Sequence, residues 1–143
     1  MSTRKQVGEQ LTLVIQEVIA SAVLTNERIA RSIGLNVVDF QTYGVILRNG
    51  EPMTPGQVAR ATELPSSTTT RVLDRLEAKG MVERRPDAGD RRKVWVRALP
   101  FHDAEVEAAY AEIVWQMEET HAAFTVAELE VALRYLREIK DVR

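Results

Sequence analysis

Cysteine is absent from the 143-residue sequence, and histidine occurs only twice. Without cysteine the chain can form no disulfide, no thiol nucleophile and no cysteine-ligated zinc site. His102 and His121 stand nineteen residues apart, with no partner at metal-ligand spacing. Asp103 and Glu105 follow His102, but carboxylates are common in the first turn of a helix. We therefore predict no metal and no cofactor.

Enzyme motifs and long apolar runs are also missing. The sequence has no Ser-His-Asp spacing and no glycine-rich phosphate loop, so we predict that the protein is not an enzyme. Its longest apolar stretch, residues 18–24, is shorter than the roughly 20 residues of a transmembrane helix. Glu9 and Glu17 interrupt any signal-peptide core. We expect no transmembrane segment and a cytoplasmic location.

Charge is distributed unevenly along the chain. Residues 54–98 hold ten Lys and Arg against six Asp and Glu, a balance of +4. The remainder holds nine against fifteen, a balance of −6. A basic middle within an acidic protein indicates either a surface that meets a polyanion or a solvated charged face.

Apolar spacing predicts helices in the first and last thirds. Residues 7–22 repeat apolar side chains at three- and four-residue steps, with Gly34 as a stop signal, and a second helix is expected over residues 37–47. After Pro100 an apolar stripe runs from Val106 to Met117. Thr125 and Glu128 form the capping box of a last helix.

The sequence of the middle of the chain predicts two short helices followed by a hairpin. Thr54, Pro55 and Gln57 give the first helix its cap and capping box, and it ends near Thr62. The second begins with the five hydroxyl residues 66–70 and ends at Gly80. Residues 81–85 and 93–98 then alternate like strands around a turn rich in Pro, Asp and Gly. A helix-turn-helix followed by a basic hairpin is a winged helix.

The stretch "MTPGQVARATELPSSTTTRVLDRLEAKGMVERRPDAGDRRKVWV", residues 53–96, resembles the MarR family of bacterial transcriptional regulators. The most specific parts are residues 68–85 and "DRR" at residues 90–92. Ala98-Leu99 stands where members usually have Leu-Thr, so we expect the next helix to start late, near His102 or Asp103.

The resemblance implies a mainly α fold. A winged helix-turn-helix domain with a two-stranded wing, residues 35–100, is flanked by a helical dimerisation region, residues 1–34 and 101–143. It also implies a homodimer that binds a pseudo-palindromic operator in double-stranded DNA, mostly as a repressor, and releases it when a small, often aromatic, ligand binds.

The helix over residues 66–80 presents two faces. Thr69, Val72, Leu73 and Leu76 form the apolar side. If the helix enters the major groove with its N-terminus first, the opposite side meets bases and phosphates. The predicted contacts there are Ser67, Thr68, Thr70, Arg71 and Arg75. The alternative is that Ser66 and Ser67 only cap the helix and Arg71 pairs with Asp74 or Asp90; we assign Ser66 to capping.

The wing supplies the other candidate contacts. By resemblance, Arg92 reads the minor groove, and Asp90 holds the wing against the recognition helix through an arginine. The remaining predicted DNA-binding residues of the hairpin are Arg84, Arg91 and Lys93, with Arg85 as a further phosphate contact or bystander. A flexible, solvated basic turn is the alternative. Trp95 is expected to pack against a neighbouring helix.

Effector-binding residues stay unknown. Phe40, Tyr43, Tyr110 and Trp115 lie on apolar helical stripes, where core packing explains each of them better than a ligand cleft. The leading hypothesis is a dimeric, sequence-specific DNA-binding regulator. The alternative is a winged-helix protein-interaction module or a non-specific architectural DNA binder without an effector.

Overall fold

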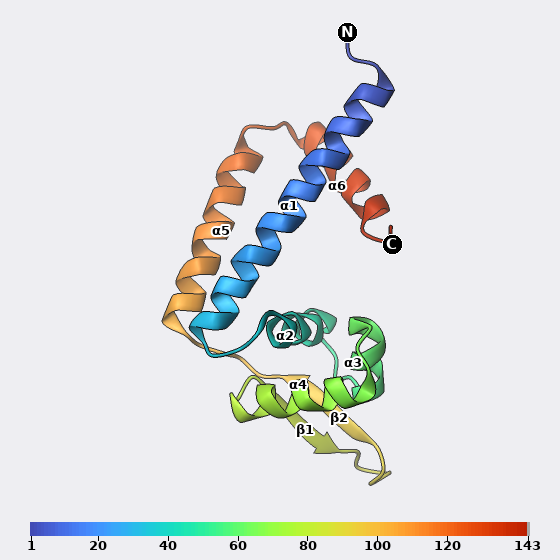
Figure 1. The fold of residues 1–143 in the computed structure, drawn as a ribbon, viewed down its shortest axis with the longest axis vertical. Helices are drawn as coiled ribbons and strands as arrows, with labels where there is room; N and C mark the ends of the chain where they lie inside the picture. The colour runs from blue at the N-terminus through green and yellow to red at the C-terminus, as the bar shows by residue number, and fades with distance from the viewer. Residues whose placement is uncertain (143) are drawn as a thin grey trace. The chain divides into compact units, whose positions relative to one another are not determined.

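The computed structural model describes residues 1–142. Within them it contains six helices and one antiparallel pair of strands (Figure 1). The elements are α1 (Arg4–Ser32), α2 (Val37–Asn49), α3 (Pro55–Thr62), α4 (Ser66–Ala78), β1 (Val82–Pro86), β2 (Val94–Ala98), α5 (Ala104–Ala122) and α6 (Val126–Ile139). This is the predicted mainly α winged helix-turn-helix fold.

The chain divides into two compact units. The first comprises Met1–His102, and the second begins at Asp103. The predicted division into residues 35–100 for DNA binding and 1–34 with 101–143 for dimerisation stays a prediction, and Arg143 lies outside the described residues.

The core of the first unit lies between α2, α3, α4 and the two strands. Val72, Leu73 and Leu76 of α4 are buried, as their spacing predicts, and Thr69 is buried beside them. They pack with apolar residues from the neighbouring elements, namely Ile46, Val58, Met81, Val82 and Val96. Burying apolar side chains is the main stabilising contribution to this small domain.

The turn between α3 and α4 differs from the prediction in one respect. The capping box of Thr54 and Gln57 is present, and α3 ends at Thr62 as predicted. Glu63 then adopts a left-handed conformation, with φ 56°. The N-cap of α4 is Pro65 and no side chain caps this helix, so the assignment of Ser66 to capping is wrong.

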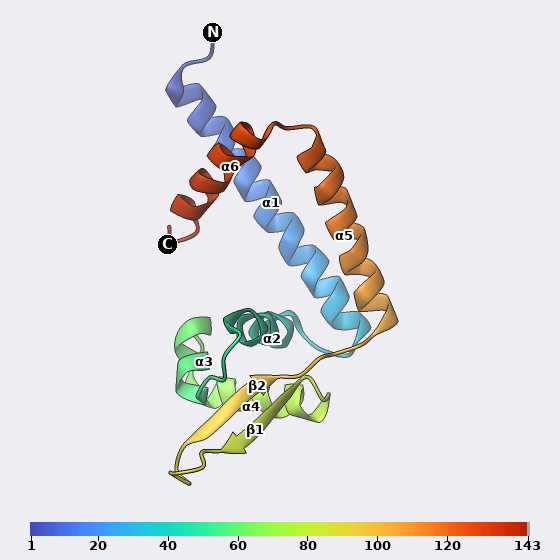
Figure 2. The same ribbon diagram turned by 180° about the vertical axis from the view of Figure 1, so that it is seen from behind.

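The wing is a regular hairpin with a third segment beside it. β1 and β2 form an antiparallel pair (Figure 2), in register from Val82↔Ala98 to Pro86↔Val94. Met53 bridges Val96 on the other side of β2. Because Val96 directs its polar backbone groups toward Met53, the N–H of Arg84 opposite it points away from β2. The carboxylate of Glu77 on α4 accepts that N–H, and Pro86 has no backbone N–H to donate. The outer edge of β1 is thereby closed to further strands.

The long N-terminal helix leaves its apolar side chains exposed. Thr3 and Gln6 form a capping box at its start, and only Ile29 and Ala30 near its end are buried. An 18-residue window has a mean hydropathy of 1.4 with none of it buried, so α1 is long and apolar enough to cross a membrane. The prediction of no transmembrane segment considers only uninterrupted apolar runs. Polar residues interrupt the apolar runs of α1, but the average over the window is still apolar. The buried core helix of a soluble protein and a signal sequence meet the same criterion.

The second unit consists of two helices with little buried surface. Asp103 caps α5, which begins at Ala104, and Thr125 with Glu128 forms the predicted capping box of α6. Tyr110 is 41% exposed and Trp115 is 55% exposed, so core packing within the chain is wrong for both. It is confirmed for Phe40, which is buried in α2. α6 has no buried residue, and its Leu133 and Leu136 are open.

Candidate nucleic-acid interface

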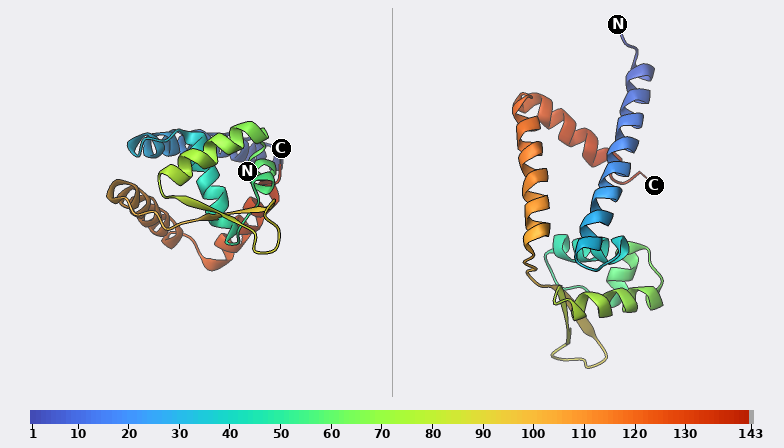
Figure 3. Two further views of the ribbon diagram at one scale, coloured as in Figure 1. Left: turned by 90° about the horizontal axis from the view of Figure 1, so that it is seen from below. Right: turned by 60° about the vertical axis from the view of Figure 1, so that its left-hand side comes forward.

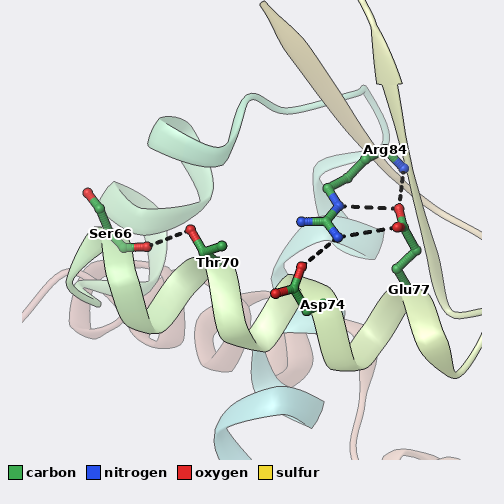
Figure 4. Close-up of polar contacts among 5 residues, drawn as sticks. All are labelled: Ser66, Thr70, Asp74, Glu77 and Arg84. Atoms are coloured by element: carbon green, nitrogen blue, oxygen red, sulfur yellow. Dashed lines mark hydrogen bonds and ion pairs between the residues drawn. The ribbon is translucent and has the colours of Figure 1, made fainter.

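The first turn and a half of α4 carries hydroxyl groups on its exposed side. Ser67 and Thr70 are exposed and Thr68 is half-buried. The Thr70 hydroxyl donates to the Ser66 carbonyl oxygen at 3.0 Å, which leaves its oxygen able to accept (Figure 4). The buried Thr69 makes the same bond to Pro65. Bonding to the preceding turn satisfies a threonine hydroxyl within a helix and fixes its orientation.

Free backbone donors lie at the same end of α4. The first helical N–H groups of any helix have no partner in the preceding turn, and here no side chain caps them. Together with the positive end of the helix dipole they form a site that attracts anions such as phosphate. Arg71 is exposed one turn later. Among the described residues it makes no ion pair, so the predicted alternative of pairing with Asp74 or Asp90 is wrong.

Arg75 is engaged with a buried carboxylate. Its Nε and one terminal nitrogen donate to the two oxygens of Asp39 on α2, at 2.9 and 2.8 Å. The Asp39 side chain is 1% exposed. The hydrogen bond to Asp39 raises the pKa of Arg75. A bidentate pair of this kind fixes both distance and orientation between α2 and α4.

Arg84 is engaged in the same way from the opposite side. It reaches from β1 to Asp74 at 2.6 Å and to Glu77 at 3.2 Å, both on α4 (Figure 4). Glu77 also accepts the backbone N–H of Arg84 at 3.0 Å. Hydrogen bonding to Arg84 lowers the pKa of Glu77. Both guanidinium groups are already partnered within the chain. That Arg75 and Arg84 contact DNA stays a prediction.

The turn of the wing is organised by Asp87. Its carboxylate accepts the N–H groups of Gly89 and Asp90 and the indole N–H of Trp95, at 2.8 to 3.0 Å. These bonds, the one from Trp95 above all, lower the pKa of Asp87. A carboxylate that caps the turn in this way holds the hairpin tip in one conformation. These contacts shape the turn, and that its arginines bind DNA rather than form a solvated basic turn stays a prediction.

Asp90 contacts an arginine of the wing and not one of α4. Its Oδ1 accepts the backbone N–H of Arg92 at 3.0 Å and Nε of Arg92 at 3.3 Å. This differs from the expected link between the wing and the recognition helix. The side chain of Arg92 is 92% exposed, and Arg91 beside it is also exposed. The wing therefore presents two arginines to solvent near its turn. In the right-hand view of Figure 3 the turn of the hairpin projects beyond α4.

Trp95 packs within the wing, so the expectation that it packs against a helix is wrong. Besides its bond to Asp87, the Nζ of Lys93 lies 4.5 Å from the centre of its ring. The cation over the ring places Lys93 on the outer face of the sheet. Trp95 also lines a shallow groove of about 430 Å³ with Glu51, Pro52, Glu83, Arg85 and Arg97. This lining balances two carboxylates against two guanidinium groups.

Sequence reasoning missed the carboxylates that organise this surface. Asp39, in the first turn of α2, has the position of an ordinary dipole-favouring residue. Its partner lies 36 residues away, beyond any local pattern. Asp87 could have been found, because Asp within a Pro- and Gly-containing turn commonly accepts backbone N–H groups two and three residues on.

Comparison with known proteins gives a consistent result. The model of the MarR family matches residues 33–93. The uncharacterized HTH-type transcriptional regulator YcgE of Bacillus subtilis is 26% identical over 145 residues, covering 99% of this chain and 94% of YcgE.

Solved structures agree with these sequence matches. A MarR family protein from Bacillus stearothermophilus has a TM-score of 0.71 at 22% identity, over 97% of this chain and 96% of that one. A mutant of MepR from S. aureus, solved bound to an oligodeoxyribonucleotide, has a TM-score of 0.61 at 19% identity, over 90% and 94%. The winged helix, the family match over residues 33–93 and a relative that spans almost the whole chain agree with one another: this chain is similar to transcriptional regulators of the MarR family and has their fold.

Proposed function

We propose that the protein is a homodimeric, sequence-specific repressor that binds a pseudo-palindromic operator and is released by a small-molecule ligand. The observation that carries the DNA-binding part is the N-terminal end of α4. Exposed hydroxyls, uncapped backbone N–H groups and the exposed Arg71 lie together there, and a basic wing follows α4 in the chain. Such a surface offers donors to phosphates and both donors and acceptors to base edges.

Each group has a distinct role in this proposal. Ser67, Thr68 and Thr70 contact base edges or phosphates, and Arg71 pairs with a guanine. Arg92 enters the minor groove, where a narrow, electronegative groove favours arginine. Arg91 and Lys93 neutralise phosphates and add salt-dependent affinity.

The dimer part rests on the exposed apolar faces of the long helices. α1 exposes Leu13, Val14, Val18, Ile19 and Leu24, and α6 exposes Val131, Leu133 and Leu136. An exposed apolar face on a helix marks a candidate interaction site. A second copy of the chain covers it, and the two winged helices then contact two half-sites. The dimer is a soluble, cytoplasmic protein, and α1 is an interface helix.

The repressor role and release by a small, often aromatic, ligand follow from the resemblance to the family. A titration tests them directly: DNA bound to the protein is challenged with aromatic acids and amines while anisotropy is followed. Ligands found by thermal shift should release the DNA. If ligands that stabilise the free protein leave the DNA bound, release by a ligand is excluded for them.

The DNA-binding proposal is tested by selecting bound sequences from random double-stranded DNA and measuring affinity for the recovered site. Arg71→Ala should cost about 1–3 kcal/mol and relax the preference at one base pair of each half-site. Arg92→Ala should weaken binding mainly to sites with a narrow A·T-rich flank. Lys5→Ala, which removes one exposed charge remote from α4, serves as the matched control.

One result supports the architectural alternative. If selection recovers no common sequence and Arg71→Ala changes all DNA equally, the protein binds DNA without reading it. If binding is undetectable at about 50 mM salt, where phosphate contacts are strong, the protein-interaction module becomes the better account.

A further inference from the structure

The charged run at residues 74–77 of α4 is attached on both of its sides. We propose that Arg75 and Arg84 are positioning residues, which together with Asp39, Asp74 and Glu77 brace α4 against α2 and β1 and thereby orient its N-terminal end for DNA. This inference rests on the proposed function, and it assigns to both arginines a role other than direct DNA contact.

The attachment to α2 is the more buried of the two. Both oxygens of Asp39 accept from Arg75, while the rest of the Asp39 side chain is enclosed. A buried carboxylate without its partner is strongly unfavourable. Arg75 therefore stays with Asp39 when DNA approaches, because a phosphate contact would require abandoning a buried negative charge.

The attachment to β1 uses one arginine for two turns of α4. Arg84 joins Asp74 and Glu77 through its guanidinium, and its backbone N–H joins Glu77 as well. The Arg84 side chain is only 27% exposed because it lies between the strand and the helix (Figure 4). This attachment joins the base of the wing to the same stretch of helix that Asp39 holds from the other side.

The position of the brace explains its effect on recognition. Ser67 lies eight residues before Arg75, which is about 12 Å along the helix axis at roughly 1.5 Å per residue. A tilt of about 10° at the brace moves that end by about 2 Å, whereas binding groups need placement to within about 0.5 Å. The brace therefore controls whether hydroxyls and Arg71 reach their partners.

Removing a carboxylate distinguishes a brace from a DNA contact by the sign of the effect. If Arg84 contacts a phosphate, Glu77→Gln frees it and removes a repelling charge, so DNA binding becomes tighter. If Arg84 is part of the brace, Glu77→Gln weakens operator binding by about 1.4-fold to fivefold, the range expected for one partly exposed ion pair. Binding to unrelated DNA stays the same or tightens, so the ratio of operator affinity to affinity for unrelated DNA falls.

Arg84→Lys gives a second, independent readout. Lysine keeps the positive charge that a phosphate needs but cannot bond to two carboxylates in the fork geometry of arginine. The brace predicts a loss of operator affinity like that of Glu77→Gln, with the salt dependence of binding unchanged. An affinity within error of the parent protein would overturn the proposal.

Controls separate the brace from other causes. Glu51→Gln removes a carboxylate from the exposed loop before α3, away from the ion pairs of the brace, and it should leave the ratio unchanged. Circular dichroism and thermal unfolding of every variant confirm the fold, and Asp74→Asn replaces Glu77→Gln if that variant is unstable. A parent protein that binds no sequence selectively refutes the proposed function and with it this inference. Selective binding by the parent with tighter binding by Glu77→Gln refutes the inference alone.

Discussion

The winged helix and the long helices bury their apolar residues to very different extents. In the winged helix, Leu73 is 1% exposed and the facing residues of α2, α3 and both strands are equally enclosed. In α6, Leu136 is 54% exposed, and the helix has no buried residue. Both regions have similar apolar periodicity and similar capping boxes, at Thr54 and at Thr125. Periodicity thus identifies an apolar face, but it does not say whether the same chain or another covers it.

The difference assigns separate tasks to the two regions. The winged helix completes its core with its own residues, so it can present α4 and the wing in a fixed geometry. In the proposed dimer the long helices complete theirs with a second copy of the chain, so their stability should depend on protein concentration. The predictions below test this division, from the largest expected effect to the smallest.

Charging the open face of α6 should have the largest effect. Leu133→Arg combined with Leu136→Arg places two charges in the proposed interface and should yield monomers by sedimentation. Operator affinity should fall by about 100-fold or more, because two linked half-site contacts become independent. Glu130→Arg, a charge reversal at an exposed position of α6, is the control and should leave the dimer intact. Retention of the dimer in the double variant would contradict the assigned interface.

Shortening a leucine in each region should separate folding from association. Leu73→Ala should destabilise the winged helix by about 2–5 kcal/mol, because it leaves a cavity in a closed core. Leu136→Ala should cost less, and its cost should depend on protein concentration. Urea unfolding at two widely separated protein concentrations measures both. Equal, concentration-independent costs would mean that α6 is covered within its own chain.

Much of this architecture could be predicted from local sequence. Thr54, Pro55 and Gln57 fix the start of α3, and the burial of Thr69 and Val72 follows from their spacing. The late start of α5 was predicted from Ala98-Leu99 and is confirmed by the cap at Asp103.

The remaining features depend on contacts distant in sequence. The pairing of Arg75 with Asp39 joins residues 36 positions apart, and Arg84 reaches ten positions back to Asp74. No helical or strand periodicity encodes such pairs. The prediction that Ser66 caps α4 is wrong for a local reason: Pro65 occupies the cap position, so the first serine falls inside the helix.

The capping boxes at Thr54 and Thr125 provide a matched pair of smaller perturbations. Thr54→Ala and Thr125→Ala each remove a cap and should cost about 1 kcal/mol of helix stability. For Thr54 the cost should be the same at every protein concentration. For Thr125 it should appear mainly as weaker dimerisation, measured by sedimentation. The reverse assignment of the two effects would contradict the division of tasks.

The smallest expected effect is a pH dependence from Glu77. Its pKa lies below the ordinary value of 4.5 because of Arg84, so its contribution to stability is present above that pH and is lost as pH falls through the lowered pKa. The free energy of unfolding of the parent should exceed that of Glu77→Gln by about 0.2–1 kcal/mol at neutral pH, because the ion pair is partly exposed. Urea unfolding from neutral pH to about pH 3 should show the two converging at the acid end. A constant difference would exclude ionisation of Glu77 as the cause.

The central claim is that a second copy of the chain covers the open helices while the winged helices bind DNA. The most direct test is the stoichiometry of the complex on a selected operator, measured by native mass spectrometry together with sedimentation of the free protein. The account predicts a dimer in solution and two chains on one operator. A monomeric protein that occupies the operator as a single chain would contradict it.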